Sequence, residues 1–304
     1  MITVVGSFAV GLTLRSDVFP AAGETRLARD FDQGPGGKGS NQAVQAARMG
    51  AEVEFVAAVG KDAFADMALE LYAAEGVGTR HLVGHSERNT GLGFIMLDDR
   101  GENRILLDPG ANELLSPHDV AAAEPSIANS AVVATQLEIP AAAAAAAMAA
   151  GRRAGAFTLL NPAPARGLPP EVLAEVDVLT PNQGEARALA GLSSEEECSD
   201  DELCARLLDL GPAAIVLTLG PRGALLARGK ELITIEPWPV EVVDSTGAGD
   251  AFSGTLATAA AEGAALEDAA EWAAAAGALA CKKLGVVPSL PHREQLQEFM
   301  DEGR

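Results

Sequence analysis

Short apolar runs alternate with helical patterns along the 304 residues of the chain, and this alternation predicts an α/β protein with a mostly parallel central sheet between layers of helices. Two segments in the first third break the alternation with strand patterns and turn residues, which indicates a second, smaller sheet. Hydrophobic residues make up 48% of the chain, a content that suits a packed globular core.

The strands of the main sheet are expected where short apolar runs lie between turn signals. The first strand ends at Gly6, and buried strands are expected at residues 53–59, 131–135, 156–160, 177–180 and 213–219. Helical patterns follow most of them. They predict helices at residues 64–74, with Gly76 as the C-cap, and at residues 141–151, 266–283 and 291–300.

The smaller sheet is expected to be antiparallel. Residues 92–97 and 103–107 flank Asp98-Asp99-Arg100-Gly101, which is typical of a hairpin turn because glycine readily adopts a positive φ. Residues 24–33 form a further extended pattern. We expect an appendage over the edge of the main sheet, a candidate lid formed by roughly residues 8–35 and 89–110.

The charge and the cysteines of the chain limit its partners and its location. With 22 Lys plus Arg against 43 Asp plus Glu, the net charge of −21 repels nucleic acids and anionic lipids, so we expect no nucleic acid and no membrane partner. Cys198, Cys204 and Cys281 have no metal-like spacing, which favours reduced thiols. The N-terminus lacks a signal-peptide pattern, and a cytoplasmic location is expected.

A glycine-rich segment, Gly34-Pro35-Gly36-Gly37-Lys38-Gly39-Ser40-Asn41, precedes a helical pattern. Its glycines leave room for a ligand or another backbone. It contains the spacing GxGxxG, but the first strand ends near Gly6, far before the place that a dinucleotide-binding motif requires. It also fails as a Walker A loop, because Gly39 follows Lys38. A plain glycine-rich turn before a helix remains an alternative.

A second segment, Asp244-Ser245-Thr246-Gly247-Ala248-Gly249-Asp250, also precedes a helical pattern. Its small residues expose backbone N–H groups at a helix N-terminus, which carries partial positive charge and therefore suits a phosphate. A carboxylate in the first turn, Asp250, is positioned to accept a proton from an attacking hydroxyl. The alternative is that Asp244 and Asp250 only cap the helix.

These two segments resemble the two signatures of the PfkB carbohydrate kinase family, and within it the chain most resembles the ribokinases. Further motifs follow in family order: Thr90-Gly91, Gly110-Ala111-Asn112, Gln136-Leu137-Glu138, residues 161–165, residues 180–185, residues 218–223 and residues 285–289. The resemblance implies one kinase domain over residues 1–304 with a ribokinase-like three-layer α/β/α fold and a β-sheet lid. It also implies an ATP-dependent kinase that phosphorylates a primary hydroxyl of a small sugar.

The resemblance further implies a role for each matching residue. Asp250 would be the catalytic base that deprotonates the sugar hydroxyl. The anion hole would consist of Gly247, Ala248 and Gly249. Contacts to the sugar would come from Gly37, Lys38, Gly39, Asn41, Glu138 and Asp250. Read from the residues alone, Glu138 could instead be a solvated loop acid and Lys38 a surface charge.

The nucleotide and the metal ions have matching positions as well. Asn182 and Glu185 match a motif near the phosphates and the water shell of Mg²⁺, although they also read as a helix-capping pair. Contacts to ATP would come from Thr218, Gly220, Gly223 and Gly249. A monovalent cation, K⁺, would be surrounded, mostly by backbone carbonyls, at Asp244, Thr246, Ala280, Lys283, Gly285 and Ser289. The family also suggests a homodimer formed through the lid.

The chain departs from the ribokinase pattern just after the first strand. Ribokinases typically carry Asn-x-Asp there, whereas this sequence has Ala9 and Gly11. Loss of a carboxylate that reads a hydroxyl pair makes ribose a doubtful acceptor. The alternatives are a kinase of another sugar, a nucleoside or a sugar acid, and a pseudokinase that binds sugar and nucleotide without efficient chemistry. An NAD-dependent dehydrogenase is disfavoured, because it leaves residues 244–250 unexplained.

Overall fold

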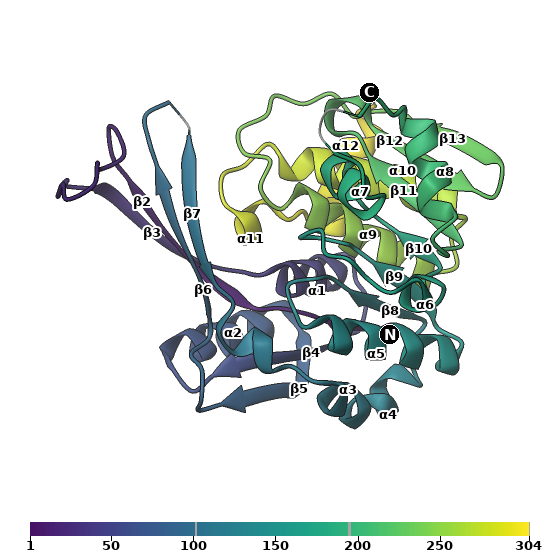
Figure 1. The fold of residues 1–304 in the computed structure, drawn as a ribbon, viewed down its shortest axis with the longest axis horizontal. Helices are drawn as coiled ribbons and strands as arrows, with labels where there is room; N and C mark the ends of the chain where they lie inside the picture. Colours follow the sequence, from purple (N-terminus) through teal and green to yellow (C-terminus); the bar gives the residue numbers. More distant parts are fainter. Residues whose placement is uncertain (101, 194–195, 304) are drawn as a thin grey trace.

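A computed structural model describes residues 1–100, 102–193 and 196–303, and for Asn103 only the backbone. Within these ranges the main sheet has nine strands in the order β13-β12-β11-β10-β9-β8-β1-β4-β5 (Figure 1). The strands from β11 to β5 are parallel, while β12 and β13 form an antiparallel edge. Their bounds are β1 Ile2–Val5, β4 Val53–Gly60, β5 Val77–His85, β8 Val132–Thr135, β9 Phe157–Leu160, β10 Val178–Leu179, β11 Ala214–Thr218, β12 Ala224–Arg228 and β13 Glu231–Ile235.

Helices cover both faces of this sheet, and each face has its own apolar core. One core lies under α1 (Lys38–Arg48), α2 (Ala63–Glu75), α9 (Ala248–Ala261) and α10 (Leu266–Ala280). The other lies under α3 (Pro117–Ala122), α4 (Glu124–Ile127), α5 (Ala141–Ala154), α6 (Pro170–Leu173), α7 (Gln183–Leu189) and α8 (Asp200–Leu208). The short helix α11 (Val286–Ser289) and α12 (Arg293–Asp301) follow α10. No helix in the described ranges is long and apolar enough to cross a bilayer.

A separate small sheet stands out from one side of the body (Figure 1). It has the order β3-β2-β6-β7, with β2 at Ala9–Arg15, β3 at Arg29–Gly36, β6 at Gly91–Leu97 and β7 at Asn103–Asp108. The expectation of an antiparallel sheet was wrong for its centre, because β2 and β6 pair in parallel. These two strands belong to separate segments of the chain that enter the sheet in the same direction, so only the outer pairs are hairpin-like.

The two faces of the small sheet differ because side chains alternate along each strand. The face of Val10, Leu12 and Leu14 packs at its base on the core of the body, where Val10 is fully buried. We call it the outer face. The inner face carries Ala9, Gly11, Thr13 and Arg15 of β2 together with their pairing partners on β3 and β6.

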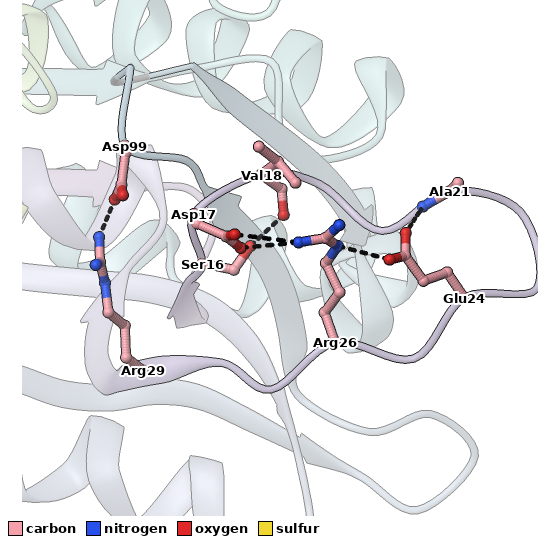
Figure 2. Close-up of polar contacts among 8 residues, drawn as sticks. All are labelled: Ser16, Asp17, Val18, Ala21, Glu24, Arg26, Arg29 and Asp99. Atoms are coloured by element: carbon pink, nitrogen blue, oxygen red, sulfur yellow. Dashed lines mark hydrogen bonds and ion pairs between the residues drawn. The ribbon is translucent and has the colours of Figure 1, made fainter.

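Ion pairs connect residues at the tip of the small sheet (Figure 2). The Arg29 guanidinium contacts the Asp99 carboxylate, which links the start of β3 to the turn between β6 and β7. Arg26 contacts Asp17 and Glu24, and so closes the loop between β2 and β3 on itself. These pairs are exposed and contribute little stability each, and of the three only the pair of Arg29 with Asp99 joins the two segments.

Most expected elements are present, with shifted ends. The helix expected at residues 266–283 ends at Ala280, because a turn at residues 281–285 replaces its last residues. The helix expected at residues 141–151 continues to Ala154 and ends at Gly155, which has a φ of 75°. The extended pattern at residues 24–33 becomes a strand only from Arg29 onward. Of the expected hairpin turn, Gly101 lies outside the described residues.

Candidate active site

Asp250 lies in the first turn of α9 and is only 5% exposed. Two side chains of α1 hold its carboxylate: Asn41 Nδ2 donates to Oδ2 at 2.8 Å and Gln42 Nε2 donates to Oδ1 at 3.1 Å. Burial raises the pKa of Asp250 above its usual range, although the Lys38 charge and these two hydrogen bonds act in the opposite direction. A buried carboxylate with a raised pKa and fixed orientation is suited to accept a proton.

Glycines allow α1 to begin directly against the first strand. Gly37, the residue before α1, has a φ of 89°, and a Cβ there would lie 2.8 Å from the backbone N of Ala9. A Cβ on Gly39 would lie 2.6 Å from Gly6 Cα. Gly254 gives α9 the same close approach, since a Cβ there would lie 2.8 Å from Gln42 O. The glycines of both motifs therefore bring Lys38 and Asn41 to Asp250.

Lys38 lies among three carboxylates. Burial alone would lower the pKa of its ammonium group, but the charges of Asp250, Glu138 and Glu185 outweigh burial and raise that pKa. Glu138 is half-buried, and its Oε2 accepts hydrogen bonds from Ser7 Oγ at 2.6 Å and from Lys38 N at 2.9 Å. The two hydrogen bonds of Glu138 and the carboxylates around Lys38 disfavour the alternatives of a solvated loop acid and a plain surface charge.

A chain of buried amides supports the carboxylate of Asp250. Gln136 Nε2 donates to Gln42 Oε1 at 2.6 Å, and Gln42 Nε2 is shared between Asp250 and Asn161 Oδ1. No pattern in the sequence points to a role for Gln42 or Ser7. Gln136 and Asn161 belong to two of the motifs that match the family. Their position in these motifs is the only feature of the sequence that points to a role in the site. These side chains orient the groups that surround Asp250.

A cavity of about 520 Å³ opens beside the N-terminus of α9. Five of the predicted nucleotide and anion-hole residues line it: Thr218, Gly220, Gly223, Ala248 and Gly249. A Cβ on Gly249 would meet no atom within 4 Å, so the backbone at this position faces open space. Much of the remaining wall is apolar and includes Trp238, Val240 and Phe252. The cavity thus combines a helix N-terminus with an apolar wall.

Asn182 and Glu185 form a capping box at the start of α7. Asn182 Oδ1 accepts from Glu185 N at 2.8 Å, and Glu185 Oε2 accepts from Asn182 N at 2.9 Å. The capping interpretation therefore describes these contacts. Asn182 also forms a parallel bridge with Thr218, and the Glu185 charge acts on Lys38. The pair thus lies next to the end of β11 and near the carboxylate cluster.

The residues expected around a monovalent cation come from two loops, the end of α10 and α11, and hydrogen bonds join three of them, Asp244, Thr246 and Gly285. Asp244 Oδ1 accepts from Thr246 N and Oγ1, and its Oδ2 accepts from Gly285 N at 3.2 Å. Burial raises the pKa of Asp244, but these hydrogen bonds and the nearby Arg15 guanidinium outweigh it and lower that pKa. Ser289 is buried on α11, whereas Lys283 is exposed.

The loop of Asp244 also contacts the anion-hole segment. A Cβ on Gly247, which has a φ of 85°, would lie 2.7 Å from Val286 Cγ1 of α11. Only glycine fits there without strain. The segment 244–250 is thus held between α11 and the start of α9.

Comparisons with known proteins agree with this arrangement. Residues 1–293 match the profile described as pfkB family carbohydrate kinase. A ribokinase from Haemophilus influenzae is 35% identical over 99% of this chain and 98% of its own length. Among solved structures, a Thermotoga maritima ribokinase has a TM-score of 0.91 and 34% identity, covering 99% of both chains. An Arabidopsis thaliana ribokinase complexed with ribose and ATP has a TM-score of 0.90 and 30% identity over 98% of this chain and 97% of its own.

The match spans nearly the whole chain, and the expected three-layer fold with its additional small sheet is confirmed. The dehydrogenase alternative has no support in these relatives. Sequence and fold agree, and the two glycine-rich motifs meet at one buried carboxylate. The chain therefore belongs to the pfkB family of carbohydrate kinases and is a ribokinase-like phosphotransferase with an alcohol group as acceptor.

Proposed function

We propose that the chain transfers the γ-phosphoryl group of ATP to a primary hydroxyl of a small sugar, with Asp250 as the catalytic base. The observation that carries this proposal is the position of Asp250, which is buried, held by two donors and directly follows Gly249, a residue that lines the cavity at the α9 N-terminus. The Arabidopsis relative, which is complexed with ribose and ATP, supports ATP as the donor and a small sugar or sugar derivative as the acceptor.

In the proposed reaction, Asp250 accepts the hydroxyl proton while the hydroxyl oxygen forms a bond to the γ-phosphorus and the bond to the ADP oxygen breaks. The backbone N–H groups of Gly247, Ala248 and Gly249 would face the charge on the transferred group, where the helix N-terminus favours an anion. The Lys38 ammonium supplies positive charge on the acceptor side. It lies close enough to Asp250 for the two charges to shift each other's pKa.

The nucleotide base would lie against the apolar wall of the cavity, beside Trp238 and Val240. Its phosphates would extend toward Gly249. The cavity volume of about 520 Å³ suits a ligand of this size. The Thr218–Gly223 segment and the α9 start would then hold opposite ends of the nucleotide.

Two metal ions fit the residues present. Mg²⁺ binds carboxylates and phosphates, usually through several waters, so Glu185 at the edge of the carboxylate cluster is suited to its water shell. When bound, it neutralises charge on the phosphates. For K⁺, the oxygens of Asp244, Thr246, Ala280, Lys283, Gly285 and Ser289 form a donor set of the kind that such cations prefer. Hydrogen bonds to Asp244 already bring two of them, Thr246 and Gly285, to its carboxylate.

The small sheet would act as a lid over the acceptor and exclude water from the reaction. The lid would also join two copies of the chain. Its outer face exposes Phe31 at 62% and Leu106 at 71%, in register with Leu14 and Phe94. An apolar sheet face of this kind is more stable when a second copy covers it. The three cysteines of the chain are unpaired, and we place the enzyme in the cytoplasm.

The test is release of ADP from ATP with Mg²⁺, in K⁺ or Na⁺ buffer, across pentoses, hexoses, sugar acids and nucleosides. We expect at least one acceptor to stimulate turnover and to yield a phosphorylated product in mass spectrometry. If no acceptor stimulates ADP release while sugar and nucleotide still bind, the chain is a pseudokinase and the proposal is wrong.

A further inference from the structure

We propose that the acceptor carries an apolar or flat substituent in place of a free anomeric hydroxyl, on the side that faces the small sheet, as in a ribofuranoside or a nucleoside. The inference rests on the proposed kinase function and names the substrate class of the same site. It follows from the direction of the inner face of the small sheet, the lack of side chains on it, and the position of the polar groups.

The inner face of the small sheet is directed toward the site. Its base adjoins the start of α1, since a Cβ on Gly37 would lie 2.8 Å from Ala9 N. Farther along the same face, Arg15 lies near enough to Asp244 for its charge to act on that carboxylate. The outer face is occupied at its base, where Gln33 Nε2 lies 3.8 Å from the Met67 sulfur of α2. The acceptor site therefore lies under the inner face.

The base of the inner face is nearly free of side chains. The pairing register aligns Ala9 with Gly36 and aligns Gly11 with Gly34 and Gly93. A Cβ on Gly34 would meet no atom within 4 Å, and the nearest atom to a Cβ on Gly11 would be Ile95 Cδ1 at 3.7 Å. The missing side chains thus leave room, and Ala9 offers only a methyl group.

On the side of β6 and β7 the border of this hollow is apolar, whereas Thr13 and Asp32 border it farther along β2 and β3. Ile95 lies beside Gly11, and Leu107 pairs with Gly93 on the same face. Leu107 is 56% exposed and Ile105, which pairs with Ile95, is also 56% exposed. Apolar side chains that flank a side-chain-free hollow favour an apolar surface on the ligand.

The polar groups of the site lie on the opposite side, around the start of α1. Lys38 and Asp250 are there, together with the buried Asn41 Oδ1, which accepts no hydrogen bond from a described residue. A buried hydrogen-bond acceptor without a donor costs free energy, and a hydroxyl of the substrate would supply the missing donor. The two sides of the site therefore differ. Polar groups near the start of α1 would form hydrogen bonds with the hydroxyls of the substrate, and the inner face of the small sheet supplies space and apolar contact.

The experiment compares kcat/KM for D-ribose, 2-deoxy-D-ribose, methyl β-D-ribofuranoside and uridine, all of which can present a primary hydroxyl. We expect the methyl riboside or uridine to be preferred over ribose by at least about tenfold, the size of effect that one apolar group in a pocket produces. A preference for ribose or for deoxyribose over both substituted compounds would overturn the inference.

Variants at Gly11 distinguish the effect of available space on substrate preference from the effect of added hydrogen-bonding groups. Gly11→Ala fills part of the hollow and should reduce kcat/KM for the substituted compounds without improving ribose. Ala9→Asn combined with Gly11→Asp adds hydrogen-bonding groups and should raise kcat/KM for ribose relative to uridine by at least about tenfold. An unchanged ratio in the double variant, with an unchanged melting temperature, would contradict the assigned position of the acceptor.

Failure of the kinase proposal gives a different result. In that case none of the four compounds stimulates ADP release, and Asp250→Asn leaves the background rate unchanged. A ribose preference that depends on Asp250 would overturn only the substrate class.

Discussion

Asn41 Nδ2 donates a 2.8 Å hydrogen bond to Asp250 Oδ2, while the Asn41 carbonyl oxygen, buried beside it, accepts no hydrogen bond in the described part of the chain. The same side chain thus fixes the proposed base and presents an oxygen to the acceptor. Rotation of the amide by half a turn would place its oxygen against the Asp250 carboxylate, so the ionised base favours the observed orientation.

Asp250→Asn should reduce turnover by about 10²- to 10⁴-fold, because an amide cannot act as the base. The fold should be retained or stabilised. A carboxyl whose pKa is raised on folding adds stability only at low pH and loses it as the pH rises through the folded pKa, so at neutral pH the ionised form opposes folding. The rotated Asn41 amide can accept from the new amide. Turnover, ATP binding by calorimetry and thermal melting test this, and a near-normal rate would remove Asp250 from its role.

The acid limb of the activity profile should shift when Lys38 is neutralised. The Lys38 charge lowers the pKa of Asp250 against the effect of burial, so Lys38→Met should raise that pKa further. Because the base must be ionised, kcat/KM should fall at a higher pH in the variant than in the wild type. Lys38→Arg keeps the charge and serves as the control. A limb that stays at the same pH in Lys38→Met would contradict the charge coupling, whatever happens to the absolute rate.

Gly39→Ala should destabilise the protein and lower its activity. The added Cβ would lie 2.6 Å from Gly6 Cα, so α1 must move away from the first strand and take Lys38 and Asn41 with it. Overpacking of this kind costs about 1–3 kcal/mol. Gly167→Ala is the matched control, because a Cβ there meets no atom within 4 Å. Denaturant titration should separate the two variants, and equal midpoints would show that α1 does not need this close approach.

Asp244→Ala should abolish stimulation by K⁺. The carboxylate accepts hydrogen bonds from Thr246 and Gly285 and so holds together the two loops that carry the proposed cation ligands. Lys282→Ala is a suitable control, since this exposed side chain lies over the Phe299 ring and is not one of the proposed cation ligands. The ratio of turnover in K⁺ to turnover in Na⁺ is the readout. An unchanged ratio in Asp244→Ala would place the cation elsewhere.

Leu106→Lys should convert a dimer into a monomer by placing a charge on the outer face of the small sheet, where Leu106 is 71% exposed. Leu232→Lys changes an exposed leucine on β13, at the far edge of the main sheet, and should leave the dimer intact. Light scattering coupled to size-exclusion chromatography measures both masses. A monomeric wild type would refute the proposed interface.

The strands of the parallel core were predictable, because their apolar runs are buried on both faces, as in β4 and β8. The edges were not. β5 mixes polar and apolar residues, and its Arg80 backbone N–H donates to the Glu54 side chain, a contact that has no local sequence pattern. The parallel pairing of β2 with β6 was also missed, because hairpin signals report only on neighbouring strands.

In the site, the residues of the motifs could be predicted from the sequence, but the buried side chains that hold them in place could not. Gln42 and Gln45 read as the polar side of a surface helix, yet both are buried because α9 covers that side of α1. Asn182 and Glu185 show the reverse case: a capping signal and a functional motif coincide in the same two residues, and local sequence cannot separate them.

The parallel pairing at the centre of the small sheet has a consequence for folding. Ala9 pairs with Gly91, and the chain between them forms α1, β4, α2 and β5. Contacts between such distant segments form late, because the entropy of closing a long loop is lost before the contact is gained. The hydrogen bond between Asn41 and Asp250 joins segments that are farther apart in the chain still. The cover of the acceptor site and the proposed base therefore both depend on contacts that local folding cannot supply.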